Sequence, residues 1–412
     1  MYFISGLIEE SIEKDGVVLT SKLYGSVVKL TDENLIKEYY EIKKDGCERL
    51  ETLLQKGLHE QGILQSKEEI QKDITAVNEC ERKQLGMIIM PTDACNFRCS
   101  YCYEKHESSV MKKETVCAIQ KFLENNVDNY EKIRIEWFGG EPTLCKESVL
   151  AISRKAMEVM KNKKFESSMT TNGYLLDIDT FKEFYKYGIR SYQITLDGWT
   201  HDETRPLADG SQTLNHILKN LDEIHRLSDE YQFDIILRHN ILADDFDYSW
   251  YDYLAEKYGK DSRFSILVYP VYDWGGEQVK KMKILEENSA EYAVSCHEEY
   301  IKRIGMAIQH IDKNAKRLGE GVCYAGNKND FVIRADGTLQ KCTIALEEPL
   351  NKIGYLDMDG NMHIDEELHK KWYDIPLNEK CYSCKKLISC MNKTCPLKRI
   401  QEERYICKEW EG

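Results

Sequence analysis

Short aliphatic and β-branched runs alternate with amphipathic stretches of helical spacing between residues 85 and 276. The expected strands are LGMIIM, KIRIEWF, SSMTTN, SYQITLD, FDIILRHNIL and FSILVYPVY. Parallel strands need long crossover connections, so a repeated strand, helix, strand order predicts a parallel sheet with helices outside. Six such units are fewer than the eight that close a barrel. The sequence therefore predicts an α/β fold built on a partial (β/α)6 TIM-like barrel.

Polar segments follow the first four expected strands. They are CNFRCSYCYE (95–104), GGEP (139–142), TNG (171–173) and LDG (196–198). Barrels of this type carry their chemistry in the loops at the carboxyl ends of the strands. We therefore expect these four segments to meet at one rim of the barrel and to form its functional site.

The first of these segments places Cys95, Cys99 and Cys102 within eight residues. A four-iron cubane takes one thiolate per iron, so three cysteines leave one iron open to a ligand from outside the protein. A zinc site would instead need a fourth protein ligand, and His106 is the only close candidate. The spacing favours an iron-sulfur cluster with an open iron, and zinc is the alternative.

Composition narrows the class of partner. The chain has 412 residues, 42% of them hydrophobic, which is enough for two or three domains with sizeable cores. A formal charge of −14 offers no basic stripe for nucleic acid or for an anionic membrane surface. No apolar run approaches the roughly 18 to 20 residues of a membrane span, and Glu9 and Glu10 interrupt the N-terminal MYFISGLIEE too early for a secretion signal. We expect a cytoplasmic protein that acts on small molecules or peptides, whose fifteen cysteines are more suited to metal than to disulfides.

The three cysteines, Tyr101 and the GGEP segment together resemble the radical S-adenosylmethionine (SAM) superfamily. The resemblance implies that Cys95, Cys99 and Cys102 are the catalytic ligands of a 4Fe-4S cluster whose open iron binds the amino and carboxylate groups of SAM. It further implies that the reduced cluster cleaves SAM to a 5'-deoxyadenosyl radical, which abstracts hydrogen from an unactivated carbon. A flavodoxin- or ferredoxin-type protein is the expected electron donor.

The same resemblance suggests the residues that contact SAM. Gly139 and Gly140 let the main chain approach the cofactor, and Glu141 is expected to engage its ammonium group. Arg205, in HDETRP, is expected to pair with the SAM carboxylate, and Tyr101 to lie near the adenine. Read without the resemblance, TNG is an ordinary turn and Arg205 a solvated helical residue. The other expected cofactor contacts are Pro142, Thr171, Asn172, Thr195 and Asp197.

Seven cysteines lie in the last ninety residues, and their spacing resembles the SPASM extension of radical SAM enzymes. That extension carries two auxiliary 4Fe-4S clusters. The segment IRADGTLQKC reads as a hairpin turned at Asp336-Gly337, which would bring Cys342 beside Cys323. A zinc ribbon built on CYSC is the alternative. The resemblance implies a first auxiliary cluster on Cys323, Cys342 and Cys395, and a second on Cys381, Cys384, Cys390 and Cys407.

This assignment differs from the usual SPASM pattern at one spacing and leaves one cluster ligand unassigned. Four residues separate Cys390 from Cys395, where the usual pattern has three. The first auxiliary cluster also lacks a fourth ligand, which is either Cys296 or a thiolate of the substrate on an open iron. An open iron would suit the joining of a substrate cysteine sulfur to a carbon radical, because metal binding lowers the pKa of the thiol and the cluster accepts the electron.

The N-terminal residues are expected to form a small α+β module. A hairpin over residues 16–30 is followed by two helical patterns and the charged run QSKEEIQKD. A winged-helix-like module before a SAM barrel resembles the RiPP recognition element (RRE) of enzymes that modify ribosomally made peptides. It is expected to bind a leader peptide by strand addition, and a structural cap on the barrel is the alternative. The expected domains are residues 1–84 (this RRE-like module), 85–310 (radical SAM core) and 311–412 (SPASM domain).

These features predict a radical SAM oxidoreductase that modifies a ribosomally synthesised precursor peptide with a leader and a cysteine-containing core. The expected product is a thioether between a cysteine sulfur and a carbon. A maturase that forms carbon-carbon crosslinks and an anaerobic sulfatase maturase, which makes formylglycine, are the alternatives. Sulfatase maturases carry an aspartate directly after the second SPASM cysteine, where this chain has Thr343. A plain electron carrier would leave the GGEP and LDG segments without a role.

Overall fold

A computed structural model describes residues 1–243, 247–275, 279–309, 322–391 and 395–401. The chain separates by its internal contacts into two compact units. The larger unit comprises residues 84–311 and 330–365, and the smaller unit comprises residues 1–83, 312–329 and 366–412. The two units divide residues 311–412 between them, and the three domains expected from the sequence stay a prediction.

A ten-stranded sheet forms the core of the larger unit. Its strands run in the order β11-β10-β9-β8-β7-β6-β12-β13-β14-β15. The strands from β11 to β6 are parallel to one another. Their bounds are Gln84–Ile89 (β6), Lys132–Trp137 (β7), Lys164–Thr171 (β8), Ile189–Thr195 (β9), Asp234–Ile241 (β10) and Phe264–Pro270 (β11).

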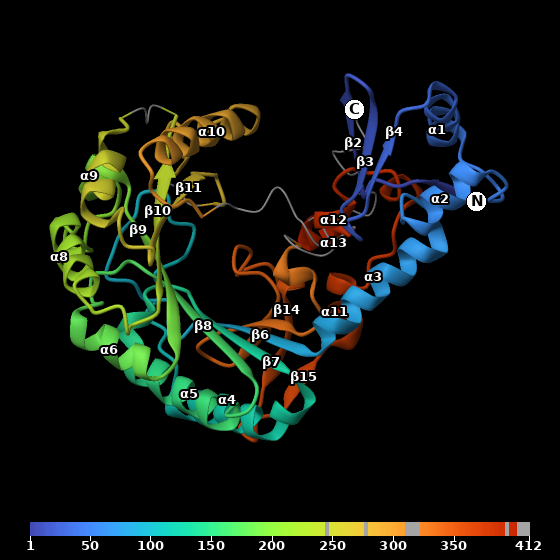
Figure 1. The fold of residues 1–412 in the computed structure, drawn as a ribbon. Helices are drawn as coiled ribbons and strands as arrows, with labels where there is room; N and C mark the ends of the chain where they lie inside the picture. Colours follow the sequence, from blue (N-terminus) through green and yellow to red (C-terminus); the bar gives the residue numbers. More distant parts are fainter. Residues whose placement is uncertain (244–246, 276–278, 310–321, 392–394, 402–412) are drawn as a thin grey trace. The chain divides into compact units, whose positions relative to one another are not determined.

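Helices connect these parallel strands. Figure 1 shows them along the outer side of the curved sheet. The α/β class and the partial (β/α)6 barrel are therefore confirmed. The helices are α4 (Lys113–Asn126), α5 (Lys146–Val159), α6 (Ile178–Lys186), α7 (His201–Thr204), α8 (Leu214–His225) and α9 (Ser249–Tyr258), with α10 (Glu287–Arg303) after β11.

The sequence pattern explains this layering. In β7 the buried side chains of Ile133, Ile135 and Trp137 alternate with partly exposed ones, as expected for a pleated strand. The strand β6 is buried along almost its whole length, which is typical of a parallel strand covered on both faces. The buried residues of α4 recur at helical spacing, so one face of the helix is apolar.

Four further strands extend the sheet beyond β6. The strand β12 (Asp330–Ile333) pairs with β6 in parallel. The strands β13 (Thr338–Gln340), β14 (Lys352–Leu356) and β15 (Met362–Ile364) follow as antiparallel neighbours. The expected hairpin is present between β12 and β13, with Gly337 at a φ of +87°. The predicted proximity of Cys342 to Cys323 involves both units and stays a prediction.

The smaller unit begins with two small sheets. β2 (Ile8–Glu13), β3 (Gly16–Ser21) and β4 (Val27–Leu30) form an antiparallel sheet, and β1 (Tyr2–Ile4) pairs with β5 (Leu64–Ser66). The hairpin expected over residues 16–30 is confirmed as β3 and β4. The sequence did not indicate β2, because four of its six residues are Glu or Ser and its side chains are mostly exposed.

Helices complete the smaller unit. The charged run QSKEEIQKD covers the end of β5 and the start of α3, where Ser66 and Glu69 make a capping box. Leu7, Ile70 and Ile74 pack in one apolar cluster with residues of the C-terminal segment, among them Cys381 and Leu387. The helices are α1 (Glu33–Asp45), α2 (Leu53–Glu60), α3 (Lys67–Arg82), α11 (Glu366–Tyr373), α12 (Leu387–Cys390) and α13 (Pro396–Gln401). Within the described ranges of both units, no helix has the length and apolar content needed to cross a membrane.

Candidate active site

A cavity of about 370 Å³ opens at the carboxyl ends of the parallel strands of the larger unit. Three of the four segments selected from the sequence line it directly. The fourth, LDG, contributes Asp197, whose carboxylate is bonded to the cavity-lining Tyr101. The order of the strands thus brings together residues that are far apart in the sequence. The lining residues from these segments are Cys95, Phe97, Cys99, Tyr101, Cys102, Tyr103, Glu104, Gly139, Gly140, Glu141, Thr171 and Asn172, and Thr195 and Arg205 also line the cavity.

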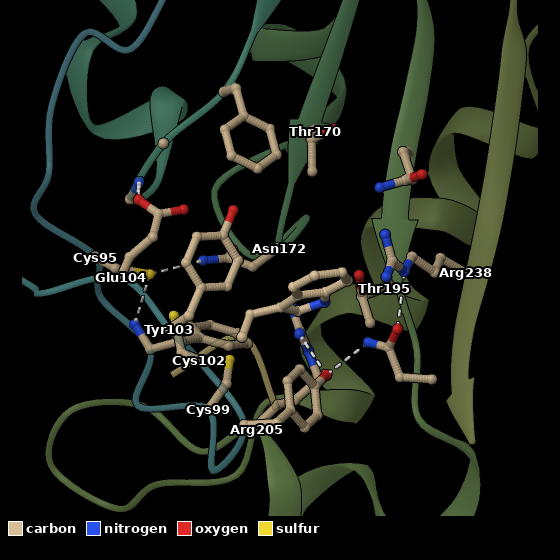
Figure 2. A pocket seen from close by; sticks show the side chains of 18 of the residues that line it. Cys95, Cys99, Cys102, Tyr103, Glu104, Thr170, Asn172, Thr195, Arg205 and Arg238 are labelled. Atoms are coloured by element: carbon tan, nitrogen blue, oxygen red, sulfur yellow. Dashed lines mark hydrogen bonds between the residues drawn. The ribbon is translucent and has the colours of Figure 1, made fainter. Parts of the chain in front are cut away.

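The three cysteines of the first segment lie together. Figure 2 shows Cys95, Cys99 and Cys102 grouped on one side of the pocket. Burial, followed by the nearby carboxylates of Glu141 and Glu104, raises the pKa of Cys95 and of Cys102 to about 12, and burial also raises the pKa of Cys99. Thiols in such surroundings ionise when they bind a cation, and this fits the ligands of an iron-sulfur cluster.

The residues near the three cysteines can also be compared with what a zinc site would need. His106 lines the cavity, and burial lowers its pKa. Among the described residues, no three His, Cys, Asp or Glu side chains are grouped as ligands of a single metal ion would be. A cubane imposes a different spacing, because each thiolate binds a different iron.

Glu141 links the GGEP segment to the TNG segment. Its side chain is 1% exposed, and its carboxylate accepts hydrogen bonds from the Thr171 hydroxyl (2.7 Å) and the Asn172 main-chain N–H (2.7 Å). The same carboxylate accepts from the main-chain N–H (3.0 Å) and the hydroxyl (2.6 Å) of Thr143. Pro142, which follows Glu141, is buried and begins a short 3-10 turn. Glu141 therefore holds together two loops that follow neighbouring strands.

Two glycines bring the GGEP segment close to the cysteine segment. Gly139 and Gly140 have φ values of +78° and +30°, and a Cβ on Gly140 would lie 2.2 Å from the carbonyl oxygen of Ala94. The N–H of Gly140 donates to the carboxylate of Glu104 over 2.9 Å, a bond drawn in Figure 2. Burial raises the pKa of Glu104. The sequence places Glu104 at the end of the cysteine segment but gave no sign of this bond.

A buried network surrounds the hydroxyl of Tyr101. The hydroxyl donates to Asp197 over 2.5 Å and accepts from Arg205 (2.8 Å) and from the side chain of Asn240 (2.9 Å). Arg205 is 7% exposed, and its Nε has no hydrogen-bond partner among the described residues. Burial acts to lower the pKa of Arg205, but Cys99, Tyr101 and Asp197 raise it overall. Arg205 is thus a buried cation that faces the cavity and not a solvated helical residue.

The wall opposite the cysteines contains residues that sequence reasoning missed. Arg238 and Asn240 lie two positions apart on β10, and both line the cavity. A parallel strand covered on both faces is usually apolar throughout. The polar residues inside FDIILRHNIL were therefore the feature from which a functional role could have been predicted. Tyr269, Tyr272 and Trp274, at and beyond the end of β11, also line the cavity.

The loop after β13 reaches the same cavity through Thr343 and Ile344. Asn351, which is fully buried, shapes this loop by accepting from the N–H of Cys342 (2.8 Å) and donating to the carbonyls of Cys342 (2.7 Å) and Ala345 (2.9 Å). Cys342 is partly buried. Thr343, which follows Cys342, the second cysteine of the SPASM-like pattern, therefore lies in the cavity wall.

The middle of the larger unit matches a known family. Residues 89–245 match the family model described as the Radical SAM superfamily. This segment is a radical SAM domain.

Other proteins are similar to the radical SAM domain or to more of the chain. A GTP 3',8-cyclase of Campylobacter jejuni subsp. doylei is 31% identical over 173 residues, which cover 41% of this chain and 52% of that protein. The chain thus spans about half the length of the curated relatives it matches first. Native anSMEcpe with bound AdoMet and Cp18Cys peptide superposes with a TM-score of 0.53 and 19% identity, covering 76% of this chain and 91% of that one. Streptococcus suis SuiB bound to precursor peptide SuiA superposes with a TM-score of 0.52 and 17% identity, covering 98% of this chain and 97% of that one. At these identities the two structures show a shared fold.

The remaining predicted cluster ligands lie outside the radical SAM domain. In the smaller unit, Cys381 is buried and Cys384 and Cys390 are partly buried. Burial is the main cause that raises the pKa of Cys381, and Cys390 and Cys384 raise it further, so these three thiols are neighbours. Their predicted partner Cys407 lies outside the described residues. Cys323 and Cys395 are exposed residues of the smaller unit, and Cys296 is a partly buried residue of α10.

Proposed function

We propose that this protein is a radical SAM enzyme in which Cys95, Cys99 and Cys102 hold a 4Fe-4S cluster and SAM occupies the adjoining cavity. The observation that carries this proposal is the meeting of three thiols, two glycine-containing loops and the buried Arg205 at the carboxyl ends of parallel strands. When bound and reduced, such a cluster with SAM on its open iron supplies a 5'-deoxyadenosyl radical that abstracts hydrogen from a substrate carbon.

The residues of the cavity have distinct tasks in this proposal. Arg205 binds the SAM carboxylate, because a buried guanidinium whose Nε has no partner among the described residues is suited to an anionic group. The Tyr101 hydroxyl orients Arg205 and Asn240 and keeps them on the cavity side. Glu141 holds the GGEP and TNG loops, whose main chain and whose Thr171 and Asn172 side chains form the wall against the cofactor, together with Thr195.

The proposed substrate is a ribosomally made precursor peptide, and the proposed product is a thioether. Two solved structures with this fold hold peptides, as their names state. Thr343 supports thioether formation over formylglycine formation, because it stands in the cavity wall where a sulfatase maturase would carry a carboxylate base. In this proposal the N-terminal module binds the leader, and a flavodoxin- or ferredoxin-type protein supplies electrons.

Two auxiliary 4Fe-4S clusters belong to the same proposal. The first would use Cys323, Cys342 and Cys395, with Cys296 or a substrate thiolate as the fourth ligand. The second would use Cys407 and the neighbouring thiols Cys381, Cys384 and Cys390, whose grouping in the smaller unit supports it. The whole chain would then bind about twelve irons, four in each of three clusters.

The cofactor assignment is tested by cleavage of SAM. Anaerobically reconstituted protein with dithionite is expected to convert SAM to 5'-deoxyadenosine, and Cys99→Ala is expected to abolish the conversion because the cluster loses a ligand. Cys117→Ala is the matched control, since Cys117 is an exposed residue of α4 outside the cavity. Undiminished cleavage by Cys99→Ala would reject the site.

The substrate assignment is tested by coexpression with a cysteine-containing precursor peptide encoded beside this protein, followed by mass spectrometry. A loss of two hydrogens with a blocked thiol is the expected result and indicates a thioether. The same loss with free thiols indicates a carbon-carbon crosslink. Conversion of GTP to a cyclised product, with the peptide left unchanged, would instead place this chain with the cyclases that it resembles over part of its length.

A further inference from the structure

Arg238 is a cation in the cavity wall to which the proposed function assigns no task. It lies on β10, and its Nε donates to the side-chain oxygen of Asn240 over 2.8 Å. Its guanidinium stacks on the ring of Tyr269, 4.2 Å from the ring centre. No carboxylate of the described residues forms an ion pair with Arg238, and its two terminal nitrogens have no hydrogen-bond partner among them.

Among the residues that the structure describes, no acidic side chain neutralises the charge of Arg238. Arg238 is partly buried, and a guanidinium stays protonated in proteins, so its charge is costly there unless an anion binds. Burial lowers the pKa of Arg238, and Arg205 lowers it further, while Tyr269, Tyr101 and Asp197 act in the opposite direction. Asp197 is already engaged by the hydroxyls of Tyr101 and Thr204. The described residues around Arg238 therefore leave its charge available to one more anion.

The position of Arg238 separates it from the expected SAM carboxylate. In the proposed function that carboxylate would bind the open iron and would therefore lie near the cysteines. Arg205 meets this requirement, because Cys99 is the largest of the influences that raise its pKa. Figure 2 shows Arg238 across the pocket from Cys95, Cys99 and Cys102.

Aromatic side chains lie near Arg238 on this side of the cavity. Tyr269, on which its guanidinium stacks, and Tyr272 and Trp274 belong to the same wall. Trp274 is 45% exposed, so this side of the cavity reaches solvent. A substrate that enters here would meet a cation with flat apolar surfaces around it.

We propose that Arg238 binds a carboxylate of the substrate and so holds the substrate over the cofactor. The planar guanidinium, oriented by Tyr269 and Asn240, presents its terminal N–H groups to the two oxygens of a carboxylate. This inference rests on the proposed function and specifies its substrate class: a peptide with an acidic side chain or a free carboxyl terminus next to the modified residue.

The first test uses benzoate and its neutral isostere benzamide as probes of the anaerobic holoenzyme, with and without SAM. Calorimetry is expected to show benzoate binding that is at least tenfold weaker in Arg238→Gln, with benzamide binding weakly to both proteins. Arg238→Lys should retain part of the benzoate affinity, because it keeps the charge but not the planar fork. Absence of benzoate binding to the native protein, or equal binding to Arg238→Gln, overturns the proposal.

A second measurement separates this site from the cofactor site. The affinity for SAM is expected to fall at least tenfold in Arg205→Gln and to change less than twofold in Arg238→Gln. If Arg238→Gln weakens SAM binding as much as Arg205→Gln does, Arg238 belongs to the cofactor site and the proposal is wrong. If the native holoenzyme binds no SAM, the proposed function is wrong. The benzoate measurement without SAM then still decides whether Arg238 binds an anion.

Two peptides of equal charge distinguish the source of the carboxylate. Acetyl-Tyr-Glu-amide carries it on a side chain, and acetyl-Tyr-Gln with a free carboxyl terminus carries it on the main chain. Binding of either peptide that Arg238→Gln weakens at least tenfold supports the proposal and identifies the source. If Arg238→Gln weakens neither, a peptide carboxylate is not the ligand.

Discussion

At the scale of single residues, the candidate site depends on buried polar groups that satisfy one another. Asp197 accepts from Tyr101 and Thr204, and its own N–H donates to Nδ1 of His201 over 3.1 Å. His201 is fully buried, and its Nε2 has no partner among the described residues. Burial of a polar group without a partner lowers stability, and burial of a charge lowers it more. The folded protein therefore favours the neutral form of His201 over its charged form.

Protonation of His201 gives the protein a defined pH dependence. Burial, and then the charge of Arg205, lowers its pKa from 6.5 to about 4. In the unfolded chain His201 binds a proton as the pH falls below 6.5, whereas in the folded protein it does so only near pH 4. The free energy of unfolding should therefore fall by about 3 kcal/mol as the pH drops from about 6.5 to about 4.

The matched variant for this prediction is His201→Asn, which keeps an acceptor for the N–H of Asp197 but does not titrate. Urea unfolding at several pH values is expected to show a shallower loss of stability in the variant over this window. Parallel curves for the two proteins would mean that other groups cause the acid sensitivity.

At the scale of elements, the strands place the loops and the loops are then tied to one another. The N–H of Glu141 donates to the carbonyl of Ala94 over 2.8 Å, and the N–H of Gly140 donates to Glu104. Both bonds join the segment after β7 to the segment after β6. The first bond requires a close approach of main chain to main chain, which the neighbouring Gly140 permits and a residue with a side chain would obstruct.

Gly140→Ala should therefore disturb both loops. Its φ of +30° disfavours any side chain, and the added Cβ would lie 2.2 Å from the carbonyl oxygen of Ala94. We expect at least a tenfold loss of SAM affinity and a lower midpoint of urea unfolding, because the cysteine segment has to shift. Calorimetry with SAM and urea unfolding measure the two effects.

Gly210→Ala is the control for backbone strain alone. Gly210 has a φ of +86°, but an added Cβ there would meet no atom of the described part of the chain within 4 Å. That variant should lose about 1 kcal/mol of stability and retain its affinity for SAM. Equal effects of the two substitutions would show that the close contact at Ala94 is unimportant.

At the scale of the whole molecule, the C-terminal strands belong to the sheet of the larger unit. Asp330 on β12 accepts from Arg134 on β7 over 3.1 Å, so their side chains meet across β6, the strand between them. Gly86 on β6 makes this possible, because a Cβ there would lie 2.1 Å from the carboxylate of Asp330. This pair joins residues 196 positions apart in the sequence.

Asp330→Ala is expected to loosen the added strands. Arg134, which is partly buried, would lose a buried partner, and the free energy of unfolding should fall by about 1 to 3 kcal/mol. Hydrogen exchange should become faster in β12 and β13 and remain unchanged in β9 and β10. Asp330→Asn, which keeps the shape but not the charge, should show a smaller effect. Uniformly faster exchange along the whole sheet would contradict a local role for this pair.

The amino-acid sequence by itself determined the parallel sheet, the meeting of its loops and the grouping of the three cysteines. These follow from local patterns: the alternation of strands and helices fixes the direction of the strands, and parallel strands end at one edge. The sequence also indicated the hairpin at Gly337, because its turn residues are adjacent.

Only the tertiary structure decided that β12 pairs with β6, that Glu104 accepts from Gly140, and that Arg238 faces the cavity without an acidic partner among the described residues. Each of these depends on which distant segments become neighbours. Hydrogen bonds, close contacts and desolvation act over a few ångströms of space, so they leave no periodic trace in the sequence.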